Sequence, residues 1–435
     1  MLYKNITELI GNTPLLKIDR TVHGIPNLNL YAKLEYMNPF GSVKDRAVWG
    51  ILRPDLKKIQ KDGSKVLEMS SGNTAKAIQS ICSQYGIPFK TITNRIKVQE
   101  VKDTLLLQGV EIEELPGSSD CHDPNDPNDP LVYIHKELTD RLQKKYFTSQ
   151  YNNERNLQEH YETTGAEILA DLTKVDYYFA GLGTTGSSRG PASRIRERDT
   201  HLKMIGVVAN KDDYIPGIRT KDEMYEVGLL QPDFYDEIVD ISAKDATEGM
   251  IELIRKCGVH SGPTGGAVYQ KIKQYFRDNP IQEELEINAV FIVCDRMENY
   301  ISYVKERQPE IFGEDSRISW KDRSDDTKQA TELEPTQASE LIHDPSWLVV
   351  DTRSPLAFKS AHIANSLNIA YDHLDKMLND GNPFCLSNKL LFVCALGEKS
   401  RKIASYCEQA GSKAYSLAGG ITSWRDKNLP LERDL

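Results

Sequence analysis

Cysteine is scarce in this chain, and its positions form no pattern. The 435 residues include seven cysteines, an odd number, and they lie scattered without paired spacing. We therefore expect no disulfide framework. Cys121-His122 has no second pair of ligands, so we expect no metal site either. These absences predict a protein of a reducing compartment, the cytoplasm.

The chain also lacks an excess of positive charge and a long apolar run. Lys and Arg number 54 against 64 Asp and Glu, and the net charge of −10 argues against binding to nucleic-acid phosphates. No apolar stretch reaches membrane-spanning length, and the opening MLYKNITELI has no signal-peptide apolar region. We expect neither nucleic acid nor a membrane as a partner.

The hydrophobic residues, 39% of the chain, follow two α/β patterns. Over residues 1–315, short β-branched runs alternate with helical segments, which predicts parallel sheets covered on both faces. The predicted strands include 28–34, 65–69, 89–92, 175–180, 204–208 and 289–294. A polar stretch at 316–336 indicates a linker, and a second α/β pattern fills 337–435. The sequence DPNDPNDP at 123–130 predicts an inserted loop.

The stretch NPFGSVKDR at 38–46 lies between a predicted strand and a predicted helix at 47–59. Gly41 permits a tight turn and Ser42 is a good helix N-cap, so Lys44 falls in the first turn of a helix. The helix dipole disfavours the charged form of a lysine there, and burial adds to this effect. Such an amine can form a Schiff base near neutral pH. The alternative is a solvated lysine, as most lysines are.

Three further stretches place glycines and hydroxyl groups where a strand meets a helix. SSGNT at 70–74 would offer backbone N–H groups to an anion such as a carboxylate. GLGTTG at 181–186 suits a phosphate, although it is neither the dinucleotide fingerprint nor a P-loop. GPTGGAV at 262–268 heads a helix, where one hydroxyl could meet a ring nitrogen. Each stretch is also compatible with an ordinary helix cap or a close turn.

Together these stretches resemble one family. The segments NITELIGNTPLL at 5–16, KLEYMNPFGSVKDRA at 33–47, SSGNT, HYETTGAEI at 160–168 and GLGTTG are similar to motifs of cysteine synthase (O-acetylserine sulfhydrylase). Cystathionine β-synthase shares these motifs. The resemblance covers residues 1 to about 312. It implies a fold-type II pyridoxal-phosphate enzyme with two α/β subdomains, pyridoxal 5'-phosphate as cofactor, and a homodimer.

The resemblance also implies roles for individual residues. The lysine of the family motif binds the cofactor, which implies Lys44. Contact with the ring hydroxyl oxygen is implied for Asn73, and contact with the pyridine nitrogen for Thr264, or for Ser261 if the alignment shifts. The residues implied to cradle the phosphate are Gly181, Gly183, Thr184, Thr185 and Gly186. Those implied to bind the substrate carboxylate are Ser70, Ser71, Thr74 and Gln150.

One segment bears on the choice of substrate. YIPGIR at 214–219 resembles the B isozyme of cysteine synthase more than the A isozyme, which lacks the arginine. In related enzymes that use O-phosphoserine, an arginine of this loop meets the substrate phosphate. The resemblance therefore implies that Arg219 binds a phosphate by bidentate pairing. A surface arginine on a loop is the alternative.

In the second region, the predicted strand 389–393 ends at Cys394, and a loop leads into a predicted helix at 401–409. N–H donors that converge from such a loop favour a thiolate, which can take up sulfane sulfur as a persulfide. A plain core cysteine is the alternative. The segments VVDTRSPLAFKSAHIANSLNI at 349–369 and LAGGITSWRDKNLPLE at 417–432 resemble a single-domain rhodanese. The resemblance implies an active sulfurtransferase. Lys399 and Arg401 could attract an anionic donor, whereas Glu398 opposes one.

These observations together predict an enzyme of sulfur metabolism. We expect β-replacement on an activated serine, O-acetylserine or O-phosphoserine, with a sulfur nucleophile to form L-cysteine. The sulfur would be supplied as a persulfide on Cys394. Thiosulfate, sulfide, a persulfide or a sulfur carrier protein could be the donor. The alternatives are cystathionine formation, release of sulfide from cysteine, and a second region that only docks a partner.

Overall fold

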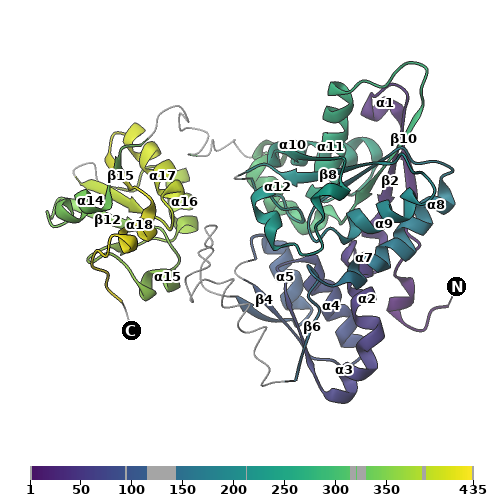
Figure 1. The fold of residues 1–435 in the computed structure, drawn as a ribbon, viewed down its shortest axis with the longest axis horizontal. Coiled ribbons are helices and arrows are strands. Elements are labelled where there is room, and N and C mark those ends of the chain that lie inside the picture. Colours follow the sequence, from purple (N-terminus) through teal and green to yellow (C-terminus); the bar gives the residue numbers. More distant parts are fainter. Residues whose placement is uncertain are drawn as a thin grey trace. The chain divides into compact units, whose positions relative to one another are not determined.

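The chain folds into two compact units, the first built from Met1–Ile92, Ile96–Glu113 and Arg141–Phe312 and the second mainly from Gly313–Leu435 (Figure 1). The computed structural model describes residues 2–93, 96–114, 144–211, 213–313, 320, 330–384 and 388–433. The loop predicted at 123–130 lies outside the described residues. Across these ranges, every helix is too short or too polar to cross a membrane.

A six-stranded sheet forms the centre of the first unit, in the order β1-β2-β10-β7-β8-β9. Its strands are β1 (Leu15–Ile18), β2 (Leu28–Leu34), β7 (Tyr177–Gly181), β8 (Lys203–Ala209), β9 (Glu237–Ile241) and β10 (Ile287–Val293). β1 runs antiparallel to β2, and every other neighbour is parallel. The parallel sheet predicted from the alternating pattern is confirmed, with one antiparallel strand added at its edge.

Helices cover both faces of this sheet, because successive residues of a strand point to opposite sides. α10 (Ala243–Cys257) and α11 (Pro263–Asp278) share a core with Phe179 of β7. α8 (Ala166–Asp171) and α9 (Gly186–Arg196) share the opposite core with the adjacent Tyr178. Both faces are therefore buried, which explains why the strands are nearly continuous apolar runs.

A second sheet of four strands, in the order β5-β4-β3-β6, forms the centre of the other half of the first unit. Its strands are β3 (Lys65–Met69), β4 (Phe89–Thr93), β5 (Glu111–Glu114) and β6 (Lys145–Phe147). A separate apolar core joins it to α2 (Lys44–Leu52), α3 (Leu56–Asp62), α4 (Asn73–Gln84) and α5 (Gln99–Leu107). The two sheets, each packed in its own apolar core residues, make the two α/β subdomains that the family resemblance implies.

Shorter elements connect these layers. Among the described residues of the first unit, the remaining α-helices are α1 (Arg20–His23), α7 (Glu154–His160) and α12 (Ile301–Arg307). A π-helical turn, Tyr161–Gly165, joins α7 to α8. The 3-10 helices are Ile6–Leu9, Glu35–Met37, Arg53–Asp55, Lys221–Glu226, Pro232–Phe234, Met297–Tyr300 and Pro309–Phe312.

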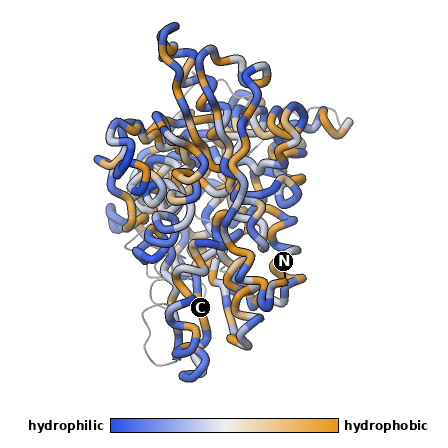
Figure 2. Tube along the Cα trace, turned by 90° about the vertical axis from the view of Figure 1, so that its right-hand side faces the viewer, coloured by the Kyte–Doolittle hydropathy of each residue, from blue (hydrophilic) through white to orange (hydrophobic). Residues whose placement is uncertain are grey.

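The second unit is a parallel sheet of five strands in the order β11-β15-β14-β12-β13. The strands are β11 (Glu332–Leu333), β12 (Trp347–Asp351), β13 (Leu367–Asn368), β14 (Lys389–Val393) and β15 (Lys413–Leu417). Its helices are α14 (Pro335–Leu341), α15 (Pro355–Ser360), α16 (Tyr371–Asp380), α17 (Glu398–Gln409) and α18 (Gly420–Asp426). Figure 2 shows hydrophobic and hydrophilic residues alternating along the tube, as expected for amphipathic elements around buried cores.

Part of the segment predicted as a linker, 316–336, belongs to the second unit. Strand β11 pairs with β15, and α14 begins at Pro335. Trp320 is buried in the core of this unit, and its indole Nε1 donates to Asp375 Oδ1 at 2.9 Å. The polar composition hid these contacts, because the buried residues among the described part of the segment, Trp320, Ala330, Leu333 and Pro335, are not consecutive.

Candidate active site

The hydroxyl of Ser42, in the loop before Lys44, forms hydrogen bonds with the first residues of α2. Gly41 has φ +88°, a left-handed conformation that favours glycine. The Ser42 hydroxyl accepts a hydrogen bond from Lys44 N at 3.2 Å and donates to Asp45 Oδ1 at 3.1 Å. Lys44 lies in the first helical turn, as predicted, but the helix begins three residues before the predicted 47. A 3-10 turn at Arg53–Asp55 ends it, because Pro54 cannot continue an α-helix.

The amine of Lys44 is half-buried and forms no hydrogen bond or ion pair with the described residues. The neighbouring carboxylate of Asp45 is fully buried and accepts from Phe40 N at 2.6 Å. Burial raises the pKa of Asp45 to about 7, so this group is a poor counter-ion for the lysine. The structure therefore leaves the Lys44 amine available to react with a carbonyl compound.

The loop of residues 70–74 combines a closed turn with an exposed face. Ser70 Oγ accepts from Gly72 N and Ala75 N, both at 3.3 Å, so its hydroxyl caps the start of α4. Ser71 is exposed. Thr74 Oγ1 donates to Gln150 Oε1 at 2.6 Å, and the two side chains are buried together. The structure thus brings Thr74 and Gln150 into contact, although 76 residues separate them.

A buried carboxylate behind this loop was not predicted. Glu68 of β3 is buried, accepts from Gln150 N at 3.2 Å, and binds the hydroxyl of Thr148 in a short hydrogen bond. Burial raises the pKa of Glu68. The only sequence signal was a charged residue within the apolar strand VLEM. Its contacts fix the backbone at Gln150.

The glycine-rich loop between β7 and α9 is shaped for an anion. Thr185, the N-cap of α9, has φ +66°, and its buried Oγ1 makes no hydrogen bond within the described residues. Thr184 Oγ1 accepts from Asn156 Nδ2 at 3.0 Å. A Cβ at Gly186 would lie 2.1 Å from Asn156 Oδ1, so glycine is required there. An unpaired hydroxyl at the N-terminus of a helix fits a phosphate. Asn156 is a second residue that sequence reasoning missed.

The two candidates for the pyridine nitrogen differ in position. Thr264, in the first turn of α11, donates from Oγ1 to Pro216 O at 2.6 Å. Its Cγ2 would lie 2.8 Å from a Cβ at Gly181, which places Thr264 against the glycine-rich loop of residues 181–186. Ser261 donates to Gly262 O at 2.8 Å. Both hydroxyls bind backbone carbonyls in this structure, and Thr264 lies beside the loop.

Arg219 is half-buried beside the predicted carboxylate site. Its guanidinium lies 4.8 Å from the ring centre of Tyr151, the residue after Gln150. Nη1 donates to Glu223 O at 3.0 Å, and the backbone N donates to Leu182 O at 3.0 Å. Arg219 thus lies next to Leu182 of the glycine-rich loop and next to Tyr151, which follows Gln150.

Hydrogen bonds join the predicted stretches into one site. Val43 N donates to Cys294 O at 2.8 Å, and Asn73 Nδ2 donates to Asp295 Oδ2 at 2.6 Å, which links the lysine loop to α4. Thr74, also on α4, contacts Gln150. Gln150 in turn is bound by Asn156, whose Nδ2 donates to Gln150 O at 3.0 Å. Asn156 reaches the phosphate loop at Thr184.

The second unit has its own site at the end of β14. Cys394 is 3% exposed, and its Sγ accepts from Gly397 N at 3.1 Å, Ser400 N at 3.5 Å and Ser400 Oγ at 3.4 Å. The Ser400 hydroxyl also lies 2.9 Å from Ser416 Oγ. Three converging donors suit a thiolate. Helix α17 begins at Glu398, before the predicted 401, and this brings its first N–H groups to the sulfur.

The cations near Cys394 are engaged elsewhere. Lys399 Nζ lies 4.4 Å from the ring centre of Tyr371, and Arg401 Nε lies 3.2 Å from Glu332 Oε1. Glu398 is exposed, and Leu396 at the tip of the loop is 47% exposed. The surface of the loop is therefore apolar and acidic rather than basic.

Comparison with known proteins agrees with both units. The family model described as "Pyridoxal-phosphate dependent enzyme" matches residues 6–295, and the "Rhodanese-like domain" model matches residues 334–427. The chain belongs to the pyridoxal-phosphate dependent enzyme family, of fold-type II, and carries a C-terminal rhodanese-like domain. Its cofactor is pyridoxal 5'-phosphate, which the unpaired hydroxyl of Thr185 and the unpaired amine of Lys44 fit.

Individual relatives are similar over the first unit. Cysteine synthase B of Escherichia coli is 29% identical over 316 residues, which cover 71% of this chain and 96% of that protein. The N-(2-amino-2-carboxyethyl)-L-glutamate synthase of Cupriavidus metallidurans is 29% identical over 313 residues, 70% of this chain and 90% of that protein. A crystal structure of a hydrogen sulfide-producing enzyme from Fusobacterium nucleatum matches with a TM-score of 0.60 and 27% identity, over 69% of this chain and 99% of that one.

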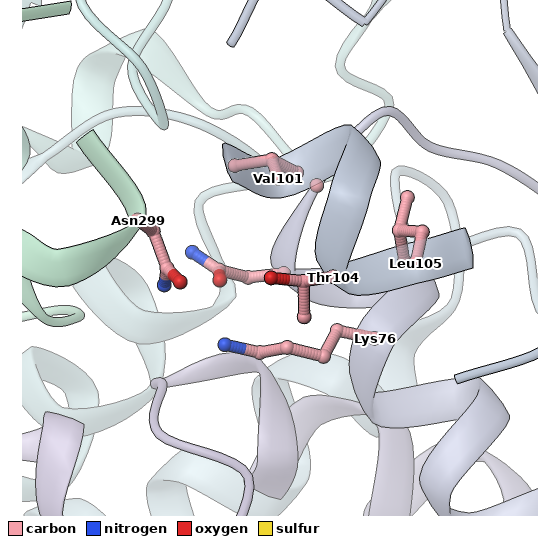
Figure 3. Close-up of a pocket in the computed structure, with 7 residues that line it drawn as sticks. Lys76, Val101, Thr104, Leu105 and Asn299 are labelled. Atoms are coloured by element: carbon pink, nitrogen blue, oxygen red, sulfur yellow. The ribbon is translucent and has the colours of Figure 1, made fainter. Parts of the chain in front are cut away.

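We predict that borohydride reduction of the holoenzyme fixes a pyridoxyl group on Lys44, located by peptide mass spectrometry. The matched alternative is Lys76 on α4, a half-buried lysine whose pKa is lowered by burial and which lines a small cavity with Asn299 (Figure 3). Lys44→Ala should lose the label and turnover, whereas Lys76→Ala should keep the label. A label found on Lys76 would refute the assignment of Lys44.

Proposed function

We propose that the first unit catalyses β-replacement on an activated serine, with a sulfur nucleophile, to form L-cysteine. The proposal rests on one observation. Hydrogen bonds hold three segments together: the loop that carries the unpaired amine of Lys44, the glycine-rich loop suited to an anion, and the buried Thr74–Gln150 pair. The carbonyl group of the cofactor, the cofactor phosphate and the substrate carboxylate would occupy these three places. The similarity to cysteine synthase B supports the reaction class.

Each residue of the site has a task in this proposal. Bound pyridoxal phosphate supplies an electron sink for the charge that develops at the substrate α-carbon. Lys44 holds the cofactor and, once freed by the substrate, takes the α-proton. Thr74 and Gln150 bind the substrate carboxylate together with Ser70 and Ser71, while residues 181–186 hold the phosphate. Asn73 meets the ring hydroxyl, and Thr264 meets the ring nitrogen.

A second reaction has support of its own. The solved relative from Fusobacterium nucleatum is described as producing hydrogen sulfide. The same binding groups would accept cysteine, with its thiol as the leaving group, because the carboxylate and phosphate sites do not depend on the β-substituent. Release of sulfide from cysteine is therefore the runner-up. Measuring products from both O-acetylserine with sulfide and cysteine alone separates the two directions.

We further propose that the rhodanese-like domain supplies the sulfur through Cys394. The Cys394 thiolate attacks the outer sulfur of a donor R–S–SH, the donor S–S bond breaks, RS⁻ leaves, and Cys394–S–SH forms. Two thiols then release hydrogen sulfide and restore Cys394, and they are oxidised to one disulfide. The three donors around Sγ support the thiolate that this step needs.

The charges around Cys394 favour a persulfide over thiosulfate as the donor. A dianion requires free cations, but Arg401 is paired with Glu332 and Lys399 lies over Tyr371. The exposed Glu398 repels anions, and the exposed Leu396 suits an apolar or protein-borne donor. A docking role without chemistry is the competing reading, and loss of sulfur transfer in Cys394→Ala with partner binding retained would exclude it.

Arg219 should distinguish the two activated serines. We predict that Arg219→Ala raises KM for O-phosphoserine far more than for O-acetylserine, because a charge-assisted bond to phosphate contributes roughly 1.5–3 kcal/mol. Steady-state kinetics with both substrates measures this difference. An equal loss with both would show that Arg219 supports the loop through Glu223 and Tyr151 instead.

Replacing Cys394 should separate the sulfur sources. We predict that Cys394→Ser reduces cysteine formation from a sulfane donor with a thiol reductant to the rate set by sulfide release from donor and thiol without enzyme, but leaves formation from free sulfide nearly unchanged. The reason is that the first unit needs only sulfide and its own residues. Tethering in one chain gives an effective concentration on the order of millimolar, so the two domains made separately should be slower with the sulfane donor at low enzyme concentration. Equal losses from both sulfur sources would instead assign Cys394 a structural role.

A further inference from the structure

A buried carboxylate and a phenol lie directly behind Asn73. Asn73 Nδ2 donates to Asp295 Oδ2 at 2.6 Å and lies 3.3 Å from the hydroxyl of Tyr300. The Tyr300 hydroxyl itself donates to Asp295 Oδ2 in a short hydrogen bond. Asp295 is 2% exposed and Tyr300 3%. The three side chains are thus joined pairwise by hydrogen bonds. The proposed reaction assigns no task to the side chains of Asp295 and Tyr300.

The position of Asp295 connects it to two other parts of the site. Its backbone carbonyl accepts from Gly262 N at 2.9 Å, next to the turn that carries Thr264, and its backbone bridges to Ser42 before Lys44. Its Oδ1 is buried without a hydrogen-bond partner among the described residues. A Cβ on Gly262 would lie only 2.1 Å from this Oδ1, so the carboxylate packs directly against Gly262. The backbone of Asp295 is therefore held on both sides, by Gly262 and by Ser42.

We propose that Asp295, with Tyr300, is a positioning residue that fixes which way the side-chain amide of Asn73 faces the cofactor ring. An amide can turn over and exchange its donor and acceptor ends. A carboxylate accepts only, so it holds the nitrogen end of Asn73 toward itself and excludes the reversed orientation. The Asn73 oxygen has no partner among the described residues and keeps one defined orientation. This inference rests on the proposed contact between Asn73 and the ring hydroxyl.

The test uses the absorbance of the bound cofactor, because the ratio of its bands depends on the hydrogen bond to the ring hydroxyl. Tyr300→Phe and Asp295→Asn should each change that ratio in the holoenzyme. They should also weaken pyridoxal phosphate binding roughly two- to tenfold, the range for one lost neutral hydrogen bond. The matched control is Tyr303→Phe, since Tyr303 is equally buried on the neighbouring helix but donates to Tyr214 O at 2.9 Å, away from Asn73.

A double-mutant cycle shows whether the effect passes through Asn73. In an Asn73→Ala background, Tyr300→Phe and Asp295→Asn should cause no further change in the band ratio. The same change in both backgrounds would overturn the inference and leave Asp295 as a fold-stabilising residue. If Asn73→Ala alone leaves the spectrum unaltered, the contact with the ring hydroxyl fails, and the inference fails with it. Tyr300→Phe leaves the Asp295 side chain unchanged, so it keeps the test usable if Asp295→Asn does not fold.

Discussion

The first unit depends on a buried arginine two residues after Lys44. Arg46 is completely buried and contacts Glu35 at 2.8 Å and Glu167 at 2.6 Å, and Lys33 completes the group 2.7 Å from Glu167. Two positive and two negative charges balance, and they join strand β2, helix α2 and helix α8. Removing one partner of such a buried network costs roughly 3–5 kcal/mol, because a charge is left unpaired. The direction of α2, and with it the position of Lys44, follows from this network.

The charges of this network stay constant around neutral pH. Burial alone would raise the pKa of Glu167. The hydrogen bonds and positive charges of Arg46 and Lys33 outweigh burial and lower this pKa to about 2. Burial lowers the pKa of His160, which faces this network, to about 3, so this ring is neutral. Glu167 therefore contributes stability above the pKa of an unfolded glutamate, and this contribution is lost only as the pH falls toward 2. Asp45, next to Lys44, differs from this network, because burial raises its pKa to about 7.

Local patterns in the sequence predicted the framework well. Strands 28–34, 65–69 and 389–393 have the observed bounds, because buried parallel strands are short, continuous β-branched runs. Lys44 was placed in the first turn of a helix from Gly41 and Ser42 alone. The partners of these residues could not be predicted, since Asn73 and Asp295 are 222 residues apart and Arg46 and Glu167 are 121 apart. Such pairs depend on the packing of whole sheets, which no local pattern encodes.

The central claim is that sulfur bound at Cys394 becomes the sulfur of cysteine formed at Lys44. The direct measurement loads the full chain with a ³⁴S-labelled persulfide donor, removes the excess, and adds O-acetylserine with dithiothreitol. Mass spectrometry then follows the label. The account predicts labelled cysteine in an amount matching the label lost from Cys394. Label that stays on Cys394, or leaves as sulfide while no labelled cysteine forms, would contradict it.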